Sequence, residues 1–303
     1  MTATPVIDIH LTGADADAAL RADVRAGLTA LPKQLPPKCS TRPRQRAVRG
    51  DHRAAGVLPH PHRTRAAGAQ LDAIAVLSGA DTLVELGSGS SAKTRLLLDA
   101  LRRAGGLRRY VPQDVSEPAL RQAMDALAAE YAGVELHGLV GDFTAHLDLL
   151  PARGRRMVAF LGGTIGNLLP AERAEFLGRL RTVLRPGEHF LLGTGLVTDV
   201  DVLVAAYDDA AGVTAEFNRN VLHVINRELG ADFDVDAFAH KAVWDADNEW
   251  IEMRLVATRP MTVTVAELDM VVDFAEGEEM CTEVSAKFRP PGCGRCWPRP
   301  GSS

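Results

Sequence analysis

The sequence has few cysteines, no long hydrophobic run and no strong excess of charge of either sign. Four cysteines occur in 303 residues without a distributed pairing pattern, so we expect a reducing compartment, the cytoplasm. No apolar stretch approaches membrane-spanning length, and the N-terminus lacks a charged segment followed by an apolar one, so we expect no membrane association and no secretion. A net charge of −5 argues against nucleic acid as the main partner.

A metal site is also not expected. Cys293 and Cys296 have the C-x-x-C spacing of zinc sites, but a zinc site needs two further ligands at matched spacing, and none is evident. The pair lies in a tail rich in proline and glycine, which predicts no metal there.

The composition, 46% hydrophobic, allows one large domain or two smaller ones. From residue 80 to 195, apolar runs alternate with helical patterns, which predicts an α/β fold with a parallel sheet covered on both faces. We expect strands at 82–86, 108–112, 134–140, 156–161 and 188–194, and helices near 90–104, 116–131 and 171–184.

The stretch Val84–Arg95 is the most informative motif. Apolar residues lead into Gly87 and Gly89, and a leucine-rich helical pattern follows. A strand, a tight glycine turn and a helix N-terminus form a cradle for a nucleotide-like ligand, because glycine allows close approach of the backbone.

Two interpretations compete for this loop. It fits the phosphate-loop pattern G-x-x-x-x-G-K-[ST] except that Ala92 replaces the second glycine, and a metal-binding aspartate after a later strand is missing. The alternative is the first loop of a methyltransferase that uses S-adenosylmethionine, in which an acidic residue, here Glu85, precedes the Gly-x-Gly turn.

Residues that follow the expected strands favour the second interpretation. Asp114 can accept both hydroxyls of a ribose, or cap the next helix. Asp142 and Phe143 can hold an adenine amine and its ring, or form an ordinary strand-end turn with a core phenylalanine. Together with Glu85, these acids suit a cationic sulfonium ligand better than a polyphosphate, which they would repel.

The sequence further resembles the histidine Nα-methyltransferases of ergothioneine biosynthesis, over roughly residues 20–38 and 70–289. The matching segments are 21–29, 35–38, 85–89 with 93–95, 141–143, 160–168, 205–215, 217–221, 277–280, 282–285 and 287–289. So many matches in order are far more specific than any one motif.

The resemblance implies three methyl transfers from S-adenosylmethionine to the α-amine of L-histidine, which gives hercynine. It also implies a Rossmann-like class I methyltransferase sheet with an inserted α+β substrate-binding lobe. The cofactor would be held by Gly87, Lys93, Asp114, Asp142 and Phe143. The substrate would be held by Asn167, Tyr207, Met253, Glu283 and Ser285, with no residue assigned as catalytic.

The chemistry of these side chains is consistent with that assignment. Asn167 offers a donor and an acceptor for a carboxylate or amine. Glu283 can accept the imidazole N–H, and Ser285 can serve the other nitrogen, so the site would reject side chains that leave these groups unpaired. Judged without the resemblance, Tyr207 would be a half-buried core residue and Glu283 a solvated strand residue.

The predicted organisation has six parts, and we expect a monomer. They are an N-terminal helical segment (1–38), an aberrant basic segment (39–70), the cofactor-binding domain (71–197), a substrate-binding insertion (198–268), a return strand of the sheet carrying substrate residues (269–289) and an aberrant tail (290–303).

The segment from residue 39 to 69 departs from the family. It holds seven arginines, three histidines (His52, His60 and His62) and one acid, and Val57 and Leu58 stand where a tyrosine pair is expected. It can be a basic arm for a polyanion or a histidine-rich metal tract. Our hypothesis is a local frameshift in the gene, or an error in its sequence, because a neighbouring reading frame can encode the missing Tyr-Tyr-Pro segment.

The tail, residues 290–303, also departs from the family. A neighbouring reading frame from Gly292 can encode an amphipathic helix in its place. Loss of the family's final helix and strand would leave an unpaired sheet edge and exposed apolar surface. We therefore expect the 303-residue chain to be less stable than its relatives and to bind histidine poorly. A histidine titration that shows normal affinity would contradict this expectation.

Two other functions stay open at this stage. One is a methyltransferase for another amino acid or amine. Substituting Glu283 or Ser285 and testing for an altered substrate preference would distinguish it from a histidine enzyme. The other is a cofactor-binding remnant or a basic-arm interaction protein, which predicts salt-sensitive polyanion binding that disappears when residues 39–69 are deleted.

Overall fold

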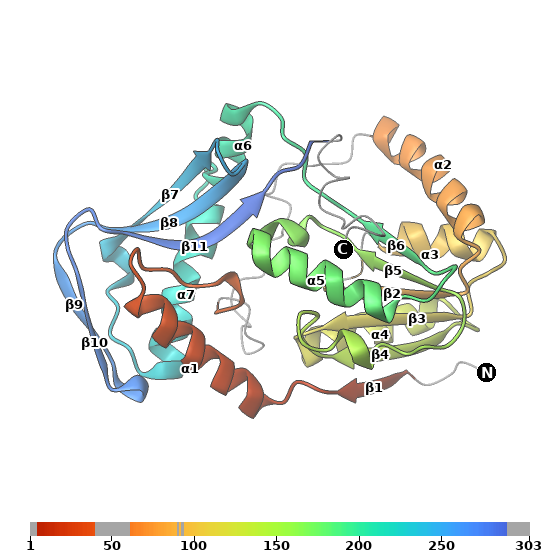
Figure 1. Ribbon diagram of the computed structural model, residues 1–303, viewed down its shortest axis with the longest axis horizontal. Helices are drawn as coiled ribbons and strands as arrows, with labels where there is room; N and C mark the ends of the chain where they lie inside the picture. Colours follow the sequence, from red (N-terminus) through yellow and green to blue (C-terminus); the bar gives the residue numbers. More distant parts are fainter. Residues whose placement is uncertain (1–4, 40–60, 90, 92–93, 290–303) are drawn as a thin grey trace, which may run out of the picture.

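The chain forms a sheet-containing lobe and a second, smaller lobe (Figure 1). The structure is a computed structural model that describes residues 5–39, 61–89, 91 and 94–289, without the side chains of Lys38 and residues 61–68. Residues 40–60 of the basic segment, Cys293, Cys296 and the rest of the tail lie outside the described residues.

The first lobe is built on a six-stranded sheet of order β1-β4-β3-β2-β5-β6, in which every pairing is parallel. Its strands are β1 (Val6–Ile9), β2 (Thr82–Leu86), β3 (Arg109–Asp114), β4 (Glu135–Val140), β5 (Arg156–Phe160) and β6 (His189–Leu192). The predicted parallel sheet is confirmed. Because β3 and β5 flank β2 on opposite sides, the strand order reverses there, and ligands bind beyond the carboxyl ends of strands at such a point.

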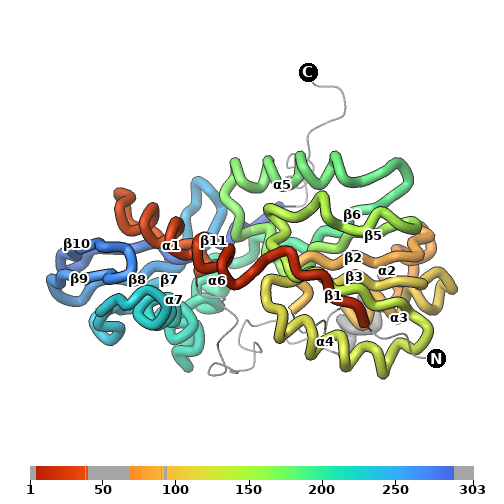
Figure 2. Tube along the Cα trace, turned by 90° about the horizontal axis from the view of Figure 1, so that it is seen from below, coloured from red at the N-terminus to blue at the C-terminus, as the bar shows by residue number. Residues whose placement is uncertain are grey.

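Helices cover both faces of the sheet. Figure 2 shows α5 (Pro170–Val183) on one side and α3 (Thr94–Arg103) and α4 (Glu117–Glu130) on the other. Successive strand residues alternate between the two layers: Leu83 packs with α3 and α4, and Val84 packs with α5. Burial on both faces explains why every residue of the central strands β2 and β5 is buried and why these strands are mostly apolar.

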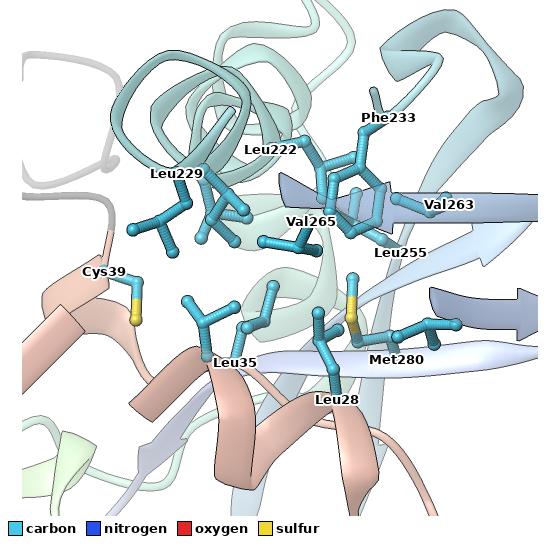
Figure 3. Packing of buried hydrophobic residues seen from close by; sticks show 14 of the residues in the cluster. Leu28, Leu35, Cys39, Leu222, Leu229, Phe233, Leu255, Val263, Val265 and Met280 are labelled. Carbon is cyan, nitrogen blue, oxygen red and sulfur yellow. The ribbon is translucent and has the colours of Figure 1, made fainter. Parts of the chain in front are cut away.

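The second lobe combines helices with antiparallel strands. Its sheets are β11-β8-β7 and β10-β9, formed by β7 (Phe238–Asp245), β8 (Trp250–Ala257), β9 (Met261–Val265), β10 (Met270–Phe274) and β11 (Glu279–Ala286), with helices α6 (Val200–Tyr207) and α7 (Val213–Leu229). Helix α1 (Gly13–Thr29) also contributes to this core. Figure 3 shows Leu28 and Leu35 from the N-terminal region packed near Met280, with Leu222 and Leu229 of α7 across the core.

The prediction that residues 269–289 form a return strand of the parallel sheet is wrong. β10 pairs with β9 and β11 pairs with β8, both antiparallel. The chain reverses at Asp269 and at Gly277, which both have positive φ (48° and 77°). These tight turns keep each new strand beside an earlier strand of the second lobe.

The N-terminal and basic segments also differ from expectation. Besides α1, the N-terminal segment contains β1, which pairs with β4 and extends the sheet by one edge strand. Helix α2 (Pro61–Ser78) crosses the predicted boundary at residue 70. The four residues of β1 are too few to show a periodicity, so sequence reasoning missed this strand.

β6 is the last strand on its side among the described residues. A hollow of about 690 Å³ lies along it, lined by residues that include Leu177, Leu184, Phe190 and Leu192. Whether the tail leaves this edge unpaired stays a prediction.

No helix in the described part of the chain is long and apolar enough to cross a membrane.

Candidate active site

The glycine loop leaves β2 at the point where the strand order reverses. Gly87 and Gly89 have φ of +68° and +50°, and a Cβ added to either would meet no atom of the described residues within 4 Å. The Gly89 N–H donates to Asp114 Oδ2 at 2.8 Å, and the Ser88 N–H donates to the Gln113 carbonyl at 3.0 Å. The end of β3 therefore holds an open backbone cradle in place.

Glu85 lies beneath this loop rather than in it. It is 3% exposed and accepts hydrogen bonds from the Thr94 hydroxyl and, at 2.5 Å, from the Tyr110 hydroxyl. The interpretation of Glu85 as one of three acids facing a cationic ligand is therefore wrong. The side chain instead ties together β2, β3 and the start of α3.

Burial gives Glu85 an effect on the pH dependence of stability. It raises the pKa of Glu85 from 4.5 to about 7 in the folded chain, so the folded chain retains this proton to higher pH than the unfolded chain. The contribution of Glu85 to the free energy of unfolding is therefore complete below pH 4.5 and is lost as the pH rises to about 7. A pKa shift of this size corresponds to roughly 3 kcal/mol.

Urea unfolding of the wild-type chain and the Glu85→Gln variant measures this effect. The free energy of unfolding of the wild type minus that of the variant should fall between about pH 5 and about pH 8. Subtracting the variant cancels the other titrating groups. A difference that stays constant, or rises, over this range would contradict the role of burial.

Asp114 and Asp142, which sequence reasoning placed around the cofactor, end the neighbouring strands β3 and β4. Asp114 Oδ1 accepts the Ser116 N–H at 3.0 Å, so this residue supports the helix start as well as the glycine loop. Asp142 Oδ1 accepts the Thr144 N–H and hydroxyl, both at 2.7 Å. Oδ2 of Asp142 makes no hydrogen bond to any described residue, so it is available to a ligand.

Phe143 packs in the hydrophobic core between the sheet and α5. Its ring centroid lies 4.8 Å from that of Phe160 and 5.7 Å from that of Phe176. Lys93, the remaining cofactor residue expected from the sequence, lies outside the described residues. The cofactor residues that can be placed therefore surround the carboxyl ends of β2, β3 and β4.

Two further residues at this edge were missed by sequence reasoning. Ser88 Oγ and Gln113 Oε1 are buried and have no hydrogen-bond partner among the described residues. Buried polar atoms without partners are rare in folded proteins. A ligand rich in hydroxyl and amine groups, such as S-adenosylmethionine, fits an open glycine cradle bordered by unpaired polar atoms and a carboxylate.

The expected substrate residues meet beside β5. Asn167 ends a short 3-10 helix (Thr164–Asn167) that follows β5, and its amide donates to Glu283 Oε1 of β11 at 3.5 Å. A Cβ on Gly166 would lie 2.6 Å from the Ala286 carbonyl oxygen, so this glycine permits the close approach of the two segments. The contact joins the second lobe to the carboxyl edge of the sheet.

Tyr207 and Ser285 form a second contact in the same region. Tyr207, the last residue of α6, and Ser285 of β11 have hydroxyl oxygens 2.7 Å apart. Burial raises the pKa of Glu283 from 4.5 to about 7, and the charge of Lys287 opposes this shift. A fully solvated Glu283 is thereby excluded.

Met253 lies opposite Glu283 in the β8–β11 register. Both residues line a hollow of about 10 Å³ together with Phe217, Asn218 and Thr282. Such a volume holds about one water molecule, so an imidazole ring can enter beside Glu283 only if neighbouring side chains shift.

Lys287 is a third residue that sequence reasoning missed. Its ammonium contacts both Tyr207 and Ser285, at 2.7 Å each. The signal in the sequence was the period of two: Glu283 and Ser285 alternate along one face of β11, and Lys287 continues this spacing one residue beyond the end of the strand. In the described part of the chain no cluster of His, Cys, Asp and Glu could hold a metal, and the histidines of the basic segment lie outside it.

Comparisons with known proteins show to which family the chain belongs. Residues 67–301 match the profile of a family described as histidine-specific methyltransferase, SAM-dependent. The chain is 56% identical to the histidine N-alpha-methyltransferase of Mycolicibacterium smegmatis, over 93% of this chain and 88% of that one. It is 53% identical to the enzyme of the same name from Mycobacterium tuberculosis, over 91% and 86%.

A more distant relative is ergothioneine biosynthesis protein 1 of Neurospora crassa, 35% identical over 49% of this chain and 17% of that one. The extent of the family match and the identity to the two bacterial enzymes confirm the resemblance found in the sequence. The chain belongs to the family of histidine-specific methyltransferases that depend on S-adenosylmethionine.

Proposed function

We propose that this chain transfers methyl groups from S-adenosylmethionine to the α-amine of L-histidine, three times in succession, to give hercynine, the first step of ergothioneine biosynthesis. The observation that carries the proposal is the meeting of Asn167, Tyr207, Glu283 and Ser285 at the carboxyl edge of the sheet. These groups offer an acceptor for an imidazole N–H and several donors for a carboxylate.

S-adenosylmethionine, when bound, supplies an electrophilic methyl group on its sulfonium. We assign Gly87 and Gly89 to the close approach of the backbone, because a Cβ at either would enter the open cradle. Asp114 would accept ribose hydroxyls, and Asp142 the adenine amine through its second oxygen. Lys93 is assigned from the sequence alone.

For the substrate, Glu283 would accept one imidazole N–H and Ser285 would serve the other nitrogen, with Met253 lining the pocket. Asn167 and Tyr207 would hold the α-carboxylate, since both can donate hydrogen bonds. These contacts direct the α-amine toward the cofactor side of the site. Methyl transfer is an in-line displacement by an unprotonated amine, so positioning matters more than a strong base.

The proposal is tested by mass spectrometry of the products formed from S-adenosylmethionine and a panel of amino acids. We expect histidine to be the preferred substrate and the trimethylated product to accumulate. Faster methylation of another amino acid would favour the alternative methyltransferase. Cofactor binding without transfer to any amino acid would favour the impaired remnant.

We further propose that the enzyme acts as a monomer in the cytoplasm and without nucleic acid. Its net charge of −5 supports the last point, because acidic surfaces repel polyanions. Light scattering of the purified chain, with and without RNA, would test the monomeric state and the absence of nucleic-acid binding together.

A further inference from the structure

We propose that Lys287 is a positioning residue that leaves one hydroxyl proton of the Tyr207–Ser285 pair to donate into the substrate site and supplies the positive charge that a substrate carboxylate needs. This inference rests on the proposed function and adds a residue to it.

The three side chains form a closed triangle. Lys287 Nζ donates to Tyr207 Oη and to Ser285 Oγ at 2.7 Å each, and the two hydroxyl oxygens are themselves 2.7 Å apart. The ammonium also lies 4.6 Å from the centroid of the Tyr207 ring, a distance at which a cation is attracted to the ring face.

Donor and acceptor counts fix the direction of the hydroxyl protons. An ammonium has three donors and no acceptor, so both hydroxyl oxygens must accept from Lys287. One hydroxyl proton serves the bond between Tyr207 and Ser285. The other has no acceptor within the triangle and is left to donate to a ligand. Without Lys287, both hydroxyls could rotate to accept, and this direction would be lost.

The positive charge of Lys287 indicates that the ligand is an anion. Lys287 is half-buried, and among the described residues its ammonium forms no ion pair with a carboxylate, although it is near enough to oppose the raised pKa of Glu283. Partly buried charges are normally paired. An amino-acid carboxylate held by Tyr207 and Asn167 would bring the missing negative charge to this place.

The path of the side chain supports a fixed position. The Lys287 backbone N–H donates to the Glu249 carbonyl at 2.8 Å. A Cβ added to Gly195 would lie 3.3 Å from Lys287 Cδ, so the loop after β6 packs directly on the lysine stem. The ammonium is therefore held from two sides rather than free to leave the triangle.

A thermodynamic cycle tests this role. Histidine affinity is measured by calorimetry with S-adenosylhomocysteine present, for the wild type, Lys287→Met, the double variant Tyr207→Phe with Ser285→Ala, and the triple variant. We expect Lys287→Met to weaken histidine binding roughly 10- to 100-fold and to leave S-adenosylhomocysteine affinity within about 2-fold, with partial recovery in Lys287→Arg.

If Lys287 acts partly through the two hydroxyls, the same substitution in the double variant should cost less than in the wild type, because only the loss of its charge remains. Equal losses in both backgrounds, or no loss in the wild-type background, would overturn the proposal. Unchanged S-adenosylhomocysteine affinity and melting temperature separate this effect from misfolding.

A second measurement does not depend on histidine. In ¹H–¹⁵N spectra of lysine ammonium groups, the Lys287 signal, identified by its loss in Lys287→Met, should shift in both Tyr207→Phe and Ser285→Ala. The signal of Lys241, which pairs with Glu279 on the surface, should not move. An unmoved Lys287 signal would overturn the inference, whereas a shifted signal in a chain that cannot methylate histidine would overturn only the proposed function.

Discussion

Replacing Glu283 by alanine is expected to lower kcat/KM for histidine on the order of 100-fold, because the imidazole N–H then enters the site without an acceptor. Glu283→Gln should lower it only about 10-fold, since the amide oxygen still accepts but carries no charge. Steady-state kinetics at saturating S-adenosylmethionine measure both values, and cofactor affinity should stay unchanged.

The matched control is Glu276→Ala. Glu276 is an exposed acid in the turn between β10 and β11, so the substitution removes the same group and the same charge from the same lobe. We expect wild-type kinetics for it. A loss of similar size in Glu276→Ala, or Glu283→Ala kinetics equal to wild type, would contradict the assignment of Glu283 to the imidazole.

Substituting Gly87 by alanine is expected to weaken binding of S-adenosylhomocysteine by more than about 10-fold. Gly87 has a φ of +68°, and its added Cβ would meet no atom of the described residues within 4 Å. The methyl group would instead project into the space assigned to the cofactor, and the backbone would carry a strain of roughly 1–2 kcal/mol. Calorimetric titration measures the affinity.

Gly105 provides the control for backbone strain. It has a φ of +76° and also leaves open space around an added Cβ, but it lies in the turn after α3, away from the loop. Gly105→Ala should therefore lower the melting temperature about as much as Gly87→Ala without changing cofactor affinity. Equal affinity losses in the two variants would show that the effect is strain and not contact with the ligand.

The sheet and the cofactor loop could be predicted because their signals are local. Apolar residues cluster in β2 and β5 and alternate with helical patterns along the chain, and the covered parallel sheet follows from that alternation. The role of Glu85 could not be predicted, because its position in the sequence does not show whether a carboxylate at a strand end turns outward or, as here, inward to Tyr110 and Thr94.

The substrate side depends on contacts between distant segments. Asn167 meets Glu283 across 116 residues of sequence, and only the resemblance to known enzymes linked them in advance. Lys287 lies in one of the matching segments, but the resemblance assigns it no role, although it continues the spacing of Glu283 and Ser285. The placement of β11 in the second lobe was predicted wrongly, because an alternating strand does not specify which sheet it joins.

The most direct test of the account is a crystal structure of this chain with S-adenosylhomocysteine and L-histidine, grown at a histidine concentration high enough to overcome weak binding. We predict the imidazole between Glu283 and Ser285, the carboxylate at Asn167 and Tyr207, and the α-amine facing the cofactor sulfur above Gly87. Histidine bound elsewhere, or bound with its amine turned away from the sulfur, would contradict the proposed site.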